Sequence, residues 1–109
     1  MGFQHKTLAS GRWFELSLAE QLGNIGSEVG RAHKLEGQNS ESFWQAVTRA
    51  LELLDLTLID RRWAGRYMEI ARAREVFADA LLGGQIYKSS LEDMERYFMN
   101  FAMLARRKA

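Results

Sequence analysis

Residues 51–59, Leu-Glu-Leu-Leu-Asp-Leu-Thr-Leu-Ile, constrain the fold of this 109-residue chain more than any other segment. They lie in a stretch with helical periodicity, yet at about 100° per residue their apolar side chains point in nearly every direction. A helix that is apolar on all sides must be covered on more than one side. The segment therefore predicts a central bundle helix. We expect Leu53, Leu56 and Ile59 to be covered by a second copy of the protein.

The length of the chain favours one domain that spans residues 1–109. Apolar residues make up 47% of the chain, which excludes disorder as its main state. The chain has no cysteine, so disulfides, thiolate metal sites and cysteine nucleophiles are excluded. It has neither an apolar run long enough to cross a membrane nor the long apolar segment of a signal peptide at its start. We therefore expect a cytoplasmic protein with no membrane contact.

Apolar spacing predicts four helices, and no segment shows the alternation of a strand. The predicted helices cover about residues 17–34, 40–59, 61–82 and 90–106. An arm over residues 1–16 precedes them, and its apolar side chains are expected to pack across the helices. Because the connections are short, neighbouring helices must be antiparallel. The sequence thus predicts an all-α fold, an antiparallel up-down-up-down four-helix bundle with a packed N-terminal arm.

The expected helix ends carry recognisable signals. Ser17 and Glu20 match a capping box, and Ser89 and Glu92 match a second one. Asp60 is expected to cap the third helix, and the glycine pair at 83–84 to end it. The side chains that the third helix is expected to bury are Trp63, Tyr67, Ile70, Phe77, Ala78 and Leu81.

One face of the first helix consists of small residues, Ala19, Gly23, Gly26 and Gly30. Each glycine inside a helix costs about 1 kcal/mol relative to alanine, so three on one side indicate a purpose. The main interpretation is close approach of another helix, either within the bundle or across a dimer. We therefore also assign Gly23, Gly26 and Gly30 to an oligomer contact. A phosphate cradle is disfavoured, since the glycines lie inside a helix rather than before one.

Arg74 falls in the middle of the apolar face of the third helix. A buried guanidinium must be paired and hydrogen-bonded, and Asp55 on the neighbouring helix is the expected partner, with Glu20 and Glu28 as alternatives. The sequence therefore predicts a buried ion pair between Arg74 and Asp55. Two other interpretations stay open: a snorkelling side chain, or an anion-binding arginine at the mouth of the bundle.

Basic residues are expected to gather at one end of the bundle. In an up-down topology the third helix starts at the end where the fourth finishes. The basic side chains that this places together are Arg61, Arg62, Arg66, Arg106, Arg107 and Lys108. With Trp13 and Trp63 nearby, such an end can contact phosphates and stack bases. The competing interpretation is a solvated helix end with ordinary charge pairing.

The sequence gives little support to catalysis. His5 and His33 have no partner at the spacing of a helical zinc site, and no Glu-x-x-His pair of a di-iron bundle is present. The Arg-x4-His pattern of helical toxin ribonucleases is absent, because residue 28 is Glu28. We therefore expect no catalytic residues, no metal and no cofactor.

Four sequence segments carry a resemblance to a known family: residues 8–13 (LASGRW), 17–22 (SLAEQL), 50–57 (ALELLDLT) and 71–76 (ARAREV). With its four helices, the chain resembles small bacterial four-helix-bundle proteins to which no activity is attached. More loosely, it is similar to the 23S rRNA intervening-sequence proteins and the accessory variability proteins of retroelements. That resemblance implies a ring-like homo-oligomer, contact with nucleic acid and a reverse-transcriptase partner.

These observations favour a non-enzymatic oligomeric scaffold or adaptor that contacts nucleic acid through its basic end. Its expected partners are a second copy of the chain and either nucleic acid or another protein. The alternative is a small ligand-binding or enzymatic bundle with a polar core site around Arg74, Asp55 and His33. A third interpretation is an antitoxin or regulator that works bound to its partner.

Overall fold

The computed structural model describes residues 11–38 and 40–107 of the protein. They form an all-α structure with four α-helices and two short 3₁₀ helices. In chain order these are η1 (Arg12–Glu15), α2 (Leu18–Lys34), α3 (Glu41–Leu58), η2 (Arg61–Arg66), α4 (Tyr67–Leu81) and α5 (Leu91–Arg107).

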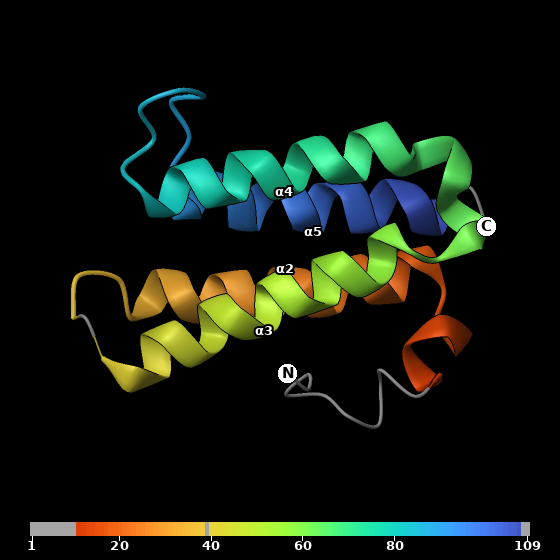
Figure 1. The fold of residues 1–109 in the computed structure, drawn as a ribbon, viewed down its shortest axis with the longest axis horizontal. Coiled ribbons are helices and arrows are strands. Elements are labelled where there is room, and N and C mark those ends of the chain that lie inside the picture. The colour runs from red at the N-terminus through yellow and green to blue at the C-terminus, as the bar shows by residue number, and fades with distance from the viewer. Residues whose placement is uncertain (1–10, 39, 108–109) are drawn as a thin grey trace.

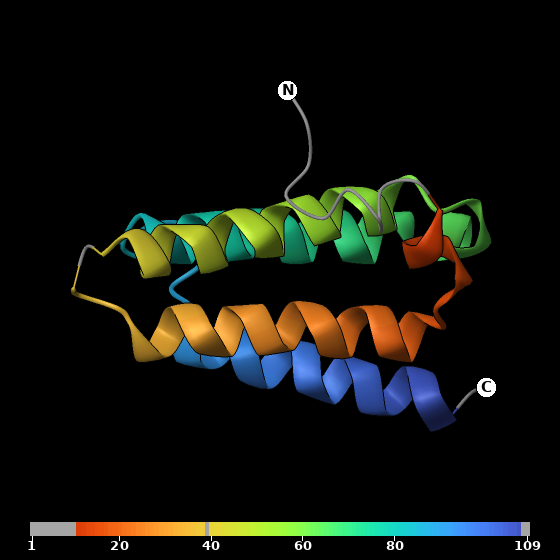
Figure 2. The same cartoon turned by 90° about the horizontal axis from the view of Figure 1, so that it is seen from below.

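The four α-helices alternate in direction and form an antiparallel bundle (Figure 1). Seen from below, α2 and α5 make one layer, and α3 and α4 make the other (Figure 2). Helix α2 packs against both α3 and α5, and α4 completes the bundle by contacting the same two helices. The expected fold class is thereby confirmed. Among the described residues, no helix has the length and apolar character needed to cross a membrane.

Each helix turns one apolar stripe towards a common core, as its spacing predicts. Side chains with almost no exposed surface come from all four helices, namely Leu22, Ile25, Leu54, Ile70, Phe77, Leu91 and Phe98. Leu53 and Leu56 are also buried, each only 2% exposed. The expectation that these two leucines form an oligomer contact is therefore wrong, because their side chains are already covered within one chain. Ile59 alone of the three is exposed, at 67%.

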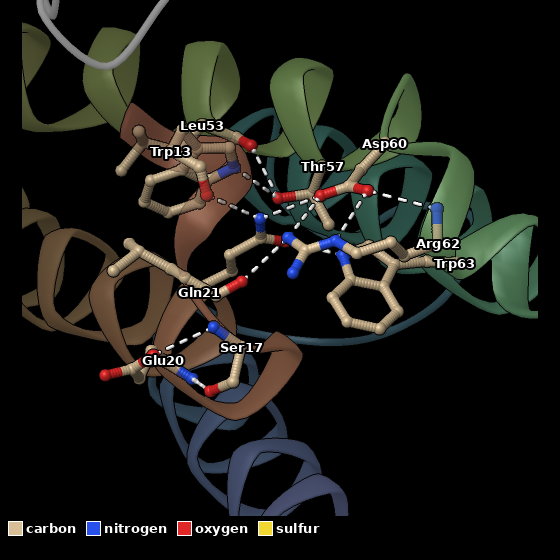
Figure 3. Close-up of polar contacts among 10 residues, drawn as sticks. Trp13, Ser17, Glu20, Gln21, Leu53, Thr57, Asp60, Arg62 and Trp63 are labelled. Carbon is tan, nitrogen blue, oxygen red and sulfur yellow. Dashed lines mark hydrogen bonds and ion pairs between the residues drawn. The ribbon is translucent and has the colours of Figure 1, made fainter. Parts of the chain in front are cut away.

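The N-terminal arm is described only in part. Residues 1–10 lie outside the described residues, so the expected packing of Phe3 and Leu8 is not tested. Residues 12–15 form η1 and bury Trp13, whose indole N–H donates to Thr57 Oγ1 on α3 at 3.1 Å. The Trp13 side chain lies beside α3, close to Leu53 and Thr57 (Figure 3).

Two expected helix starts differ from the structure. Residues 61–66 are 3₁₀ rather than α-helical, with a kink at Trp63 (φ −105°, ψ 21°), so α4 begins only at Tyr67. Tyr67 is consequently half exposed, at 50%, instead of buried. The cap of α5 is shifted by one residue from the expected pair: Ser90 and Asp93, not Ser89 and Glu92, exchange the backbone-to-side-chain bonds of a capping box.

The other residues predicted to begin or end helices are confirmed in these roles. Ser17 and Glu20 form the capping box of α2, and the Asp60 carboxylate caps η2 by accepting from the Arg62 N–H. Gly83 and Gly84 follow α4 with φ of 106° and 71°, a backbone conformation that favours glycine.

The small face of α2 serves the bundle itself. A Cβ atom on Gly26 would lie 2.7 Å from Met99 Sδ, and one on Gly30 would lie 2.5 Å from a carboxylate oxygen of Glu95. Both glycines are buried, so their assignment to an oligomer contact is wrong; they let α5 approach α2 closely. Gly23 differs, because a Cβ there would meet no atom within 4 Å.

Candidate functional site

The first turn of α2, the segment η2 and the last turn of α5 meet at one end of the bundle, at the right in Figure 1. The antiparallel topology produces this meeting, as the sequence predicts. Arg61, Arg62, Arg106 and Arg107 are exposed there and Arg66 is half-buried, whereas Lys108 lies outside the described residues. The end therefore carries a concentration of guanidinium groups.

Between these three segments lies a groove with a volume of about 650 Å³. Its lining residues are Ser17, Leu18, Ala19, Glu20, Trp63, Arg66, Ala105 and Arg106. The predicted gathering of arginines from the third and fourth helices is thus confirmed for Arg66 and Arg106, which line one concave site. We call this site the end groove.

The two arginines of the end groove have no ionic partner within 4 Å among the carboxylates that the structure describes. The Arg66 guanidinium carbon lies 5.3 Å from the centre of the Phe101 ring, a cation–π distance. Glu20 is the acidic side chain of the groove, and one of its carboxylate oxygens accepts from the Ser17 N–H at 2.8 Å. Hydrogen bonds with Ser17 and the nearby charge of Arg106 hold the pKa of Glu20 below its usual value.

Behind the groove, Gln21 is the centre of a buried polar network (Figure 3). The Gln21 side chain is fully buried, yet each of its polar atoms is hydrogen-bonded. Its Nε2 donates to the carbonyl of Trp13 at 2.9 Å and to Asp60 Oδ2 at 3.1 Å. Its Oε1 accepts from the indole N–H of Trp63 at 2.8 Å. The network joins η1, α2 and the α3–η2 junction, and it fixes Trp63 in the wall of the end groove.

Arg62 belongs to the same network. Its guanidinium donates to both oxygens of Asp60, at 3.0 and 2.7 Å, and to the carbonyl of Leu16 at 2.7 Å. The guanidinium carbon also lies 4.4 Å from the centre of the Trp63 ring. The sequence led us to expect that Arg62 contacts nucleic acid. In the structure its side chain instead links the segment before α2, at Leu16, to the start of η2, at Asp60.

The pKa of Asp60 reflects two opposed effects. Burial by itself raises the pKa of the carboxyl group, but the hydrogen bonds from Arg62 and Gln21, together with the Arg62 charge, outweigh it. The net result is a pKa below the usual value, so Asp60 is ionised at neutral pH. The hydrogen bond with Asp60 in turn raises the pKa of Arg62.

The predicted partners Arg74 and Asp55 are paired, with Arg74 Nε 2.7 Å from Asp55 Oδ1. The pair is not buried, however: the two side chains are 36% and 47% exposed. Position on the apolar face was misleading here, because Arg74 lies at the edge between α4 and α3. His33 lies in the last turn of α2, next to Glu36, at the opposite end of the bundle from Asp55. The structure therefore does not bring Arg74, Asp55 and His33 into one site.

The sequence contains a signal for this network at Gln21. Gln21 interrupts the apolar stripe of α2 between Leu18 and Ile25, where a polar side chain needs a buried partner. Among the described residues, no group of three or more histidine or acidic side chains is placed to hold a metal ion. Comparison of the chain with family models, curated proteins and solved structures gives no match.

Proposed function

We propose that the protein is a non-enzymatic helical-bundle adaptor that contacts the phosphates of nucleic acid through its arginine-rich end. The supporting observation is the gathering of Arg61, Arg66, Arg106 and Arg107 at this end, where the described residues offer none of them a salt bridge. Arginine is the side chain best suited to phosphate oxygens. We leave Arg62 out of this role, because its Nε and Nη2 atoms already donate to Asp60 and Leu16.

The small net charge of the chain is compatible with this proposal, because the charges are not spread evenly. The whole sequence has a net charge of +1, yet the end described above carries more arginines than carboxylates. The acidic side chains there are largely neutralised or engaged: Asp60 by Arg62, and Glu20 by Ser17. A local positive field is enough to attract a phosphate backbone.

Self-association is part of the proposal and depends on only a part of the surface expected. The buried Leu53, Leu56, Gly26 and Gly30 are excluded as contacts, which leaves Ile59 and Gly23 of the expected set. Ile59 follows the last residue of α3 and exposes most of its side chain. We therefore keep Ile59 as the contact to be tested.

The nucleic-acid contact is tested by measuring the fluorescence anisotropy of a labelled single-stranded oligonucleotide over a range of salt concentrations. The variant carries Arg61→Glu and Arg107→Glu, two exposed residues outside the end groove. We expect its Kd to rise at least about tenfold, and the slope of log K against log salt to fall by about 0.7 for each lost phosphate contact.

The matched control carries Arg31→Glu and Arg96→Glu, which make the same change of charge at the opposite end of α2 and α5. We expect its Kd to stay within about twofold of the wild-type value at moderate salt, where distant charges are screened. Equal losses in the two variants would contradict a specific basic end, and so would a wild-type protein that does not bind the oligonucleotide.

A further inference from the structure

We propose that the end groove binds a small amphipathic monoanion, a single carboxylate carried on an apolar chain or ring. This site shares Arg66 and Arg106 with the phosphate contacts proposed above, whereas Arg61 and Arg107 lie outside the groove. The volume of about 650 Å³ lies within the range of about 300 to 1,000 Å³ that is typical of small-molecule sites.

The lining of the groove has two parts. Leu18, Ala19, Ala105 and the indole of Trp63 provide apolar surface for the body of a ligand. The guanidinium groups of Arg66 and Arg106 belong to the same lining and find no ionic partner among the described carboxylates. An apolar surface next to unpaired guanidinium groups is complementary to a molecule with an apolar body and an anionic head.

The charges of the groove limit the ligand to one negative charge. Arg66 and Arg106 contribute two positive charges, and Glu20, a carboxylate at neutral pH, contributes one negative charge. A bound monoanion leaves the site neutral, whereas a polyanion would face repulsion from Glu20. A phosphate backbone, which needs an accumulation of positive charge, would depend on the exposed Arg61 and Arg107 as well.

The wall of the groove is fixed before a ligand arrives. The indole N–H of Trp63 donates to the buried Gln21 at 2.8 Å, and Arg62 lies over the Trp63 ring at 4.4 Å. Arg66 in turn lies over the Phe101 ring at 5.3 Å. Side chains that are already held lose little conformational entropy on binding, which favours affinity.

The test uses decanoate as the probe, below its micellar concentration, and follows two-dimensional amide NMR spectra of the full chain. The indole resonance of Trp63 and the amides of Ala19 and Ala105 should shift in a saturable way, because these residues line the groove. Decanol and decyltrimethylammonium have the same chain with a neutral and a cationic head. We expect decanoate to bind at least about tenfold more tightly than either, and equal affinities would overturn the proposal.

Three variants locate the site. Arg66→Gln and Arg106→Gln should each remove most of the preference for decanoate over decanol, and Ala105→Trp should abolish binding of both by filling the groove. Arg96→Gln changes an exposed arginine of the same helix α5, outside the groove, and should bind decanoate like the wild type. If Ala105→Trp fails to fold, Arg66→Gln and Arg106→Gln still test whether decanoate binds in the groove. A preference for decanoate over decanol that survives in both Arg66→Gln and Arg106→Gln would overturn the proposal.

The two proposals fail separately. The Arg61→Glu, Arg107→Glu variant should keep its affinity for decanoate, because both residues lie outside the end groove. A wild-type protein that binds the oligonucleotide but gives no saturable shifts with decanoate would refute the groove ligand alone. Decanoate binding without oligonucleotide binding would refute the nucleic-acid contact alone.

Discussion

At the residue scale, Gln21 and Asp60 are the side chains on which the end of the bundle depends. Both are buried, and both bond to segments far away in sequence: Gln21 to Trp13 and Trp63, and Asp60 to Gln21. A polar group that loses its partner inside a protein costs about 1 to 3 kcal/mol. The network therefore stabilises the native arrangement chiefly because any alternative leaves several of its atoms unpaired.

The lowered pKa of Asp60 predicts how stability depends on pH. Because the folded-state pKa lies below the unfolded value of about 3.9, the stabilising contribution is complete above that value and is lost as the pH falls through the folded pKa. Urea unfolding of the wild type and of Asp60→Asn should therefore show a difference in unfolding free energy that is largest above about pH 5. This difference should shrink below about pH 4.

The comparison with Asp60→Asn is needed because Glu20 and Asp93 also have lowered pKa values and add to the acid sensitivity of the wild type. Subtracting the unfolding free energy of Asp60→Asn from that of the wild type removes the contributions of Glu20 and Asp93, since both residues are present in the two proteins. A difference that stays constant from pH 6 to pH 3 would contradict the role assigned to the Asp60 carboxylate.

At the element scale, the contact of α2 with α5 depends on particular glycines. A Cβ on Gly26 or Gly30 would displace the end of an α5 side chain, Met99 or Glu95 respectively, but Gly23, on the same helix, has open space beside it. The three glycines therefore have different roles, although they lie on the same small face of α2. Gly26 and Gly30 leave space for the Met99 and Glu95 side chains of α5, whereas Gly23 has no such neighbour.

We predict that a valine substitution destabilises the protein at Gly26 but not at Gly23. Gly26→Val should lower the free energy of unfolding by about 1 to 3 kcal/mol, because the new side chain would collide with Met99 and Phe98. Gly23→Val is the matched control and should stay within about 0.5 kcal/mol of the wild type, as substitutions in open space usually do. Chemical unfolding monitored by circular dichroism measures both. Equal losses would indicate that valine is harmful anywhere in α2.

The elements were predictable from the sequence where local signals determine them. Ser17 and Glu20 announce the start of α2, and the glycines after α4 announce its end. The 3₁₀ segment was not predictable, because Trp63 is held by Gln21, a contact across 42 positions of the chain. The one-residue shift of the α5 cap has a different, local origin, since both Ser89 and Ser90 have an acidic residue three positions later.

The candidate site could be predicted only in part. Topology alone places the arginines of η2 and α5 at the same end, because the helices alternate in direction. The groove between them depends on how the side chains of three segments pack, which no periodicity encodes. For the same reason, the sequence could not show whether Leu53 and Leu56 are covered by the same chain or by a second copy.

At the scale of the whole molecule, the question is what the exposed apolar side chains do. We expect the purified protein to self-associate through Ile59, so light scattering during size exclusion should give at least the mass of a dimer. Ile59→Glu should return the mass to that of a monomer, because a buried charge without a partner is costly. Leu82→Glu is the control, since Leu82 is 81% exposed at the opposite end of the bundle. A wild-type monomer would contradict the prediction.

The bonds of η1 also decide where the smallest independently folding unit begins. A chain shortened to start at α2 would keep all four α-helices, so it would still contain every α-helix of the bundle. It would, however, lose the Trp13 indole that donates to Thr57 and the Trp13 carbonyl that accepts from Gln21. It would also lose the Leu16 carbonyl that accepts from Arg62. We therefore expect the smallest stable domain to begin at η1, before the first α-helix, although η1 is too short to be predicted as a helix from its sequence.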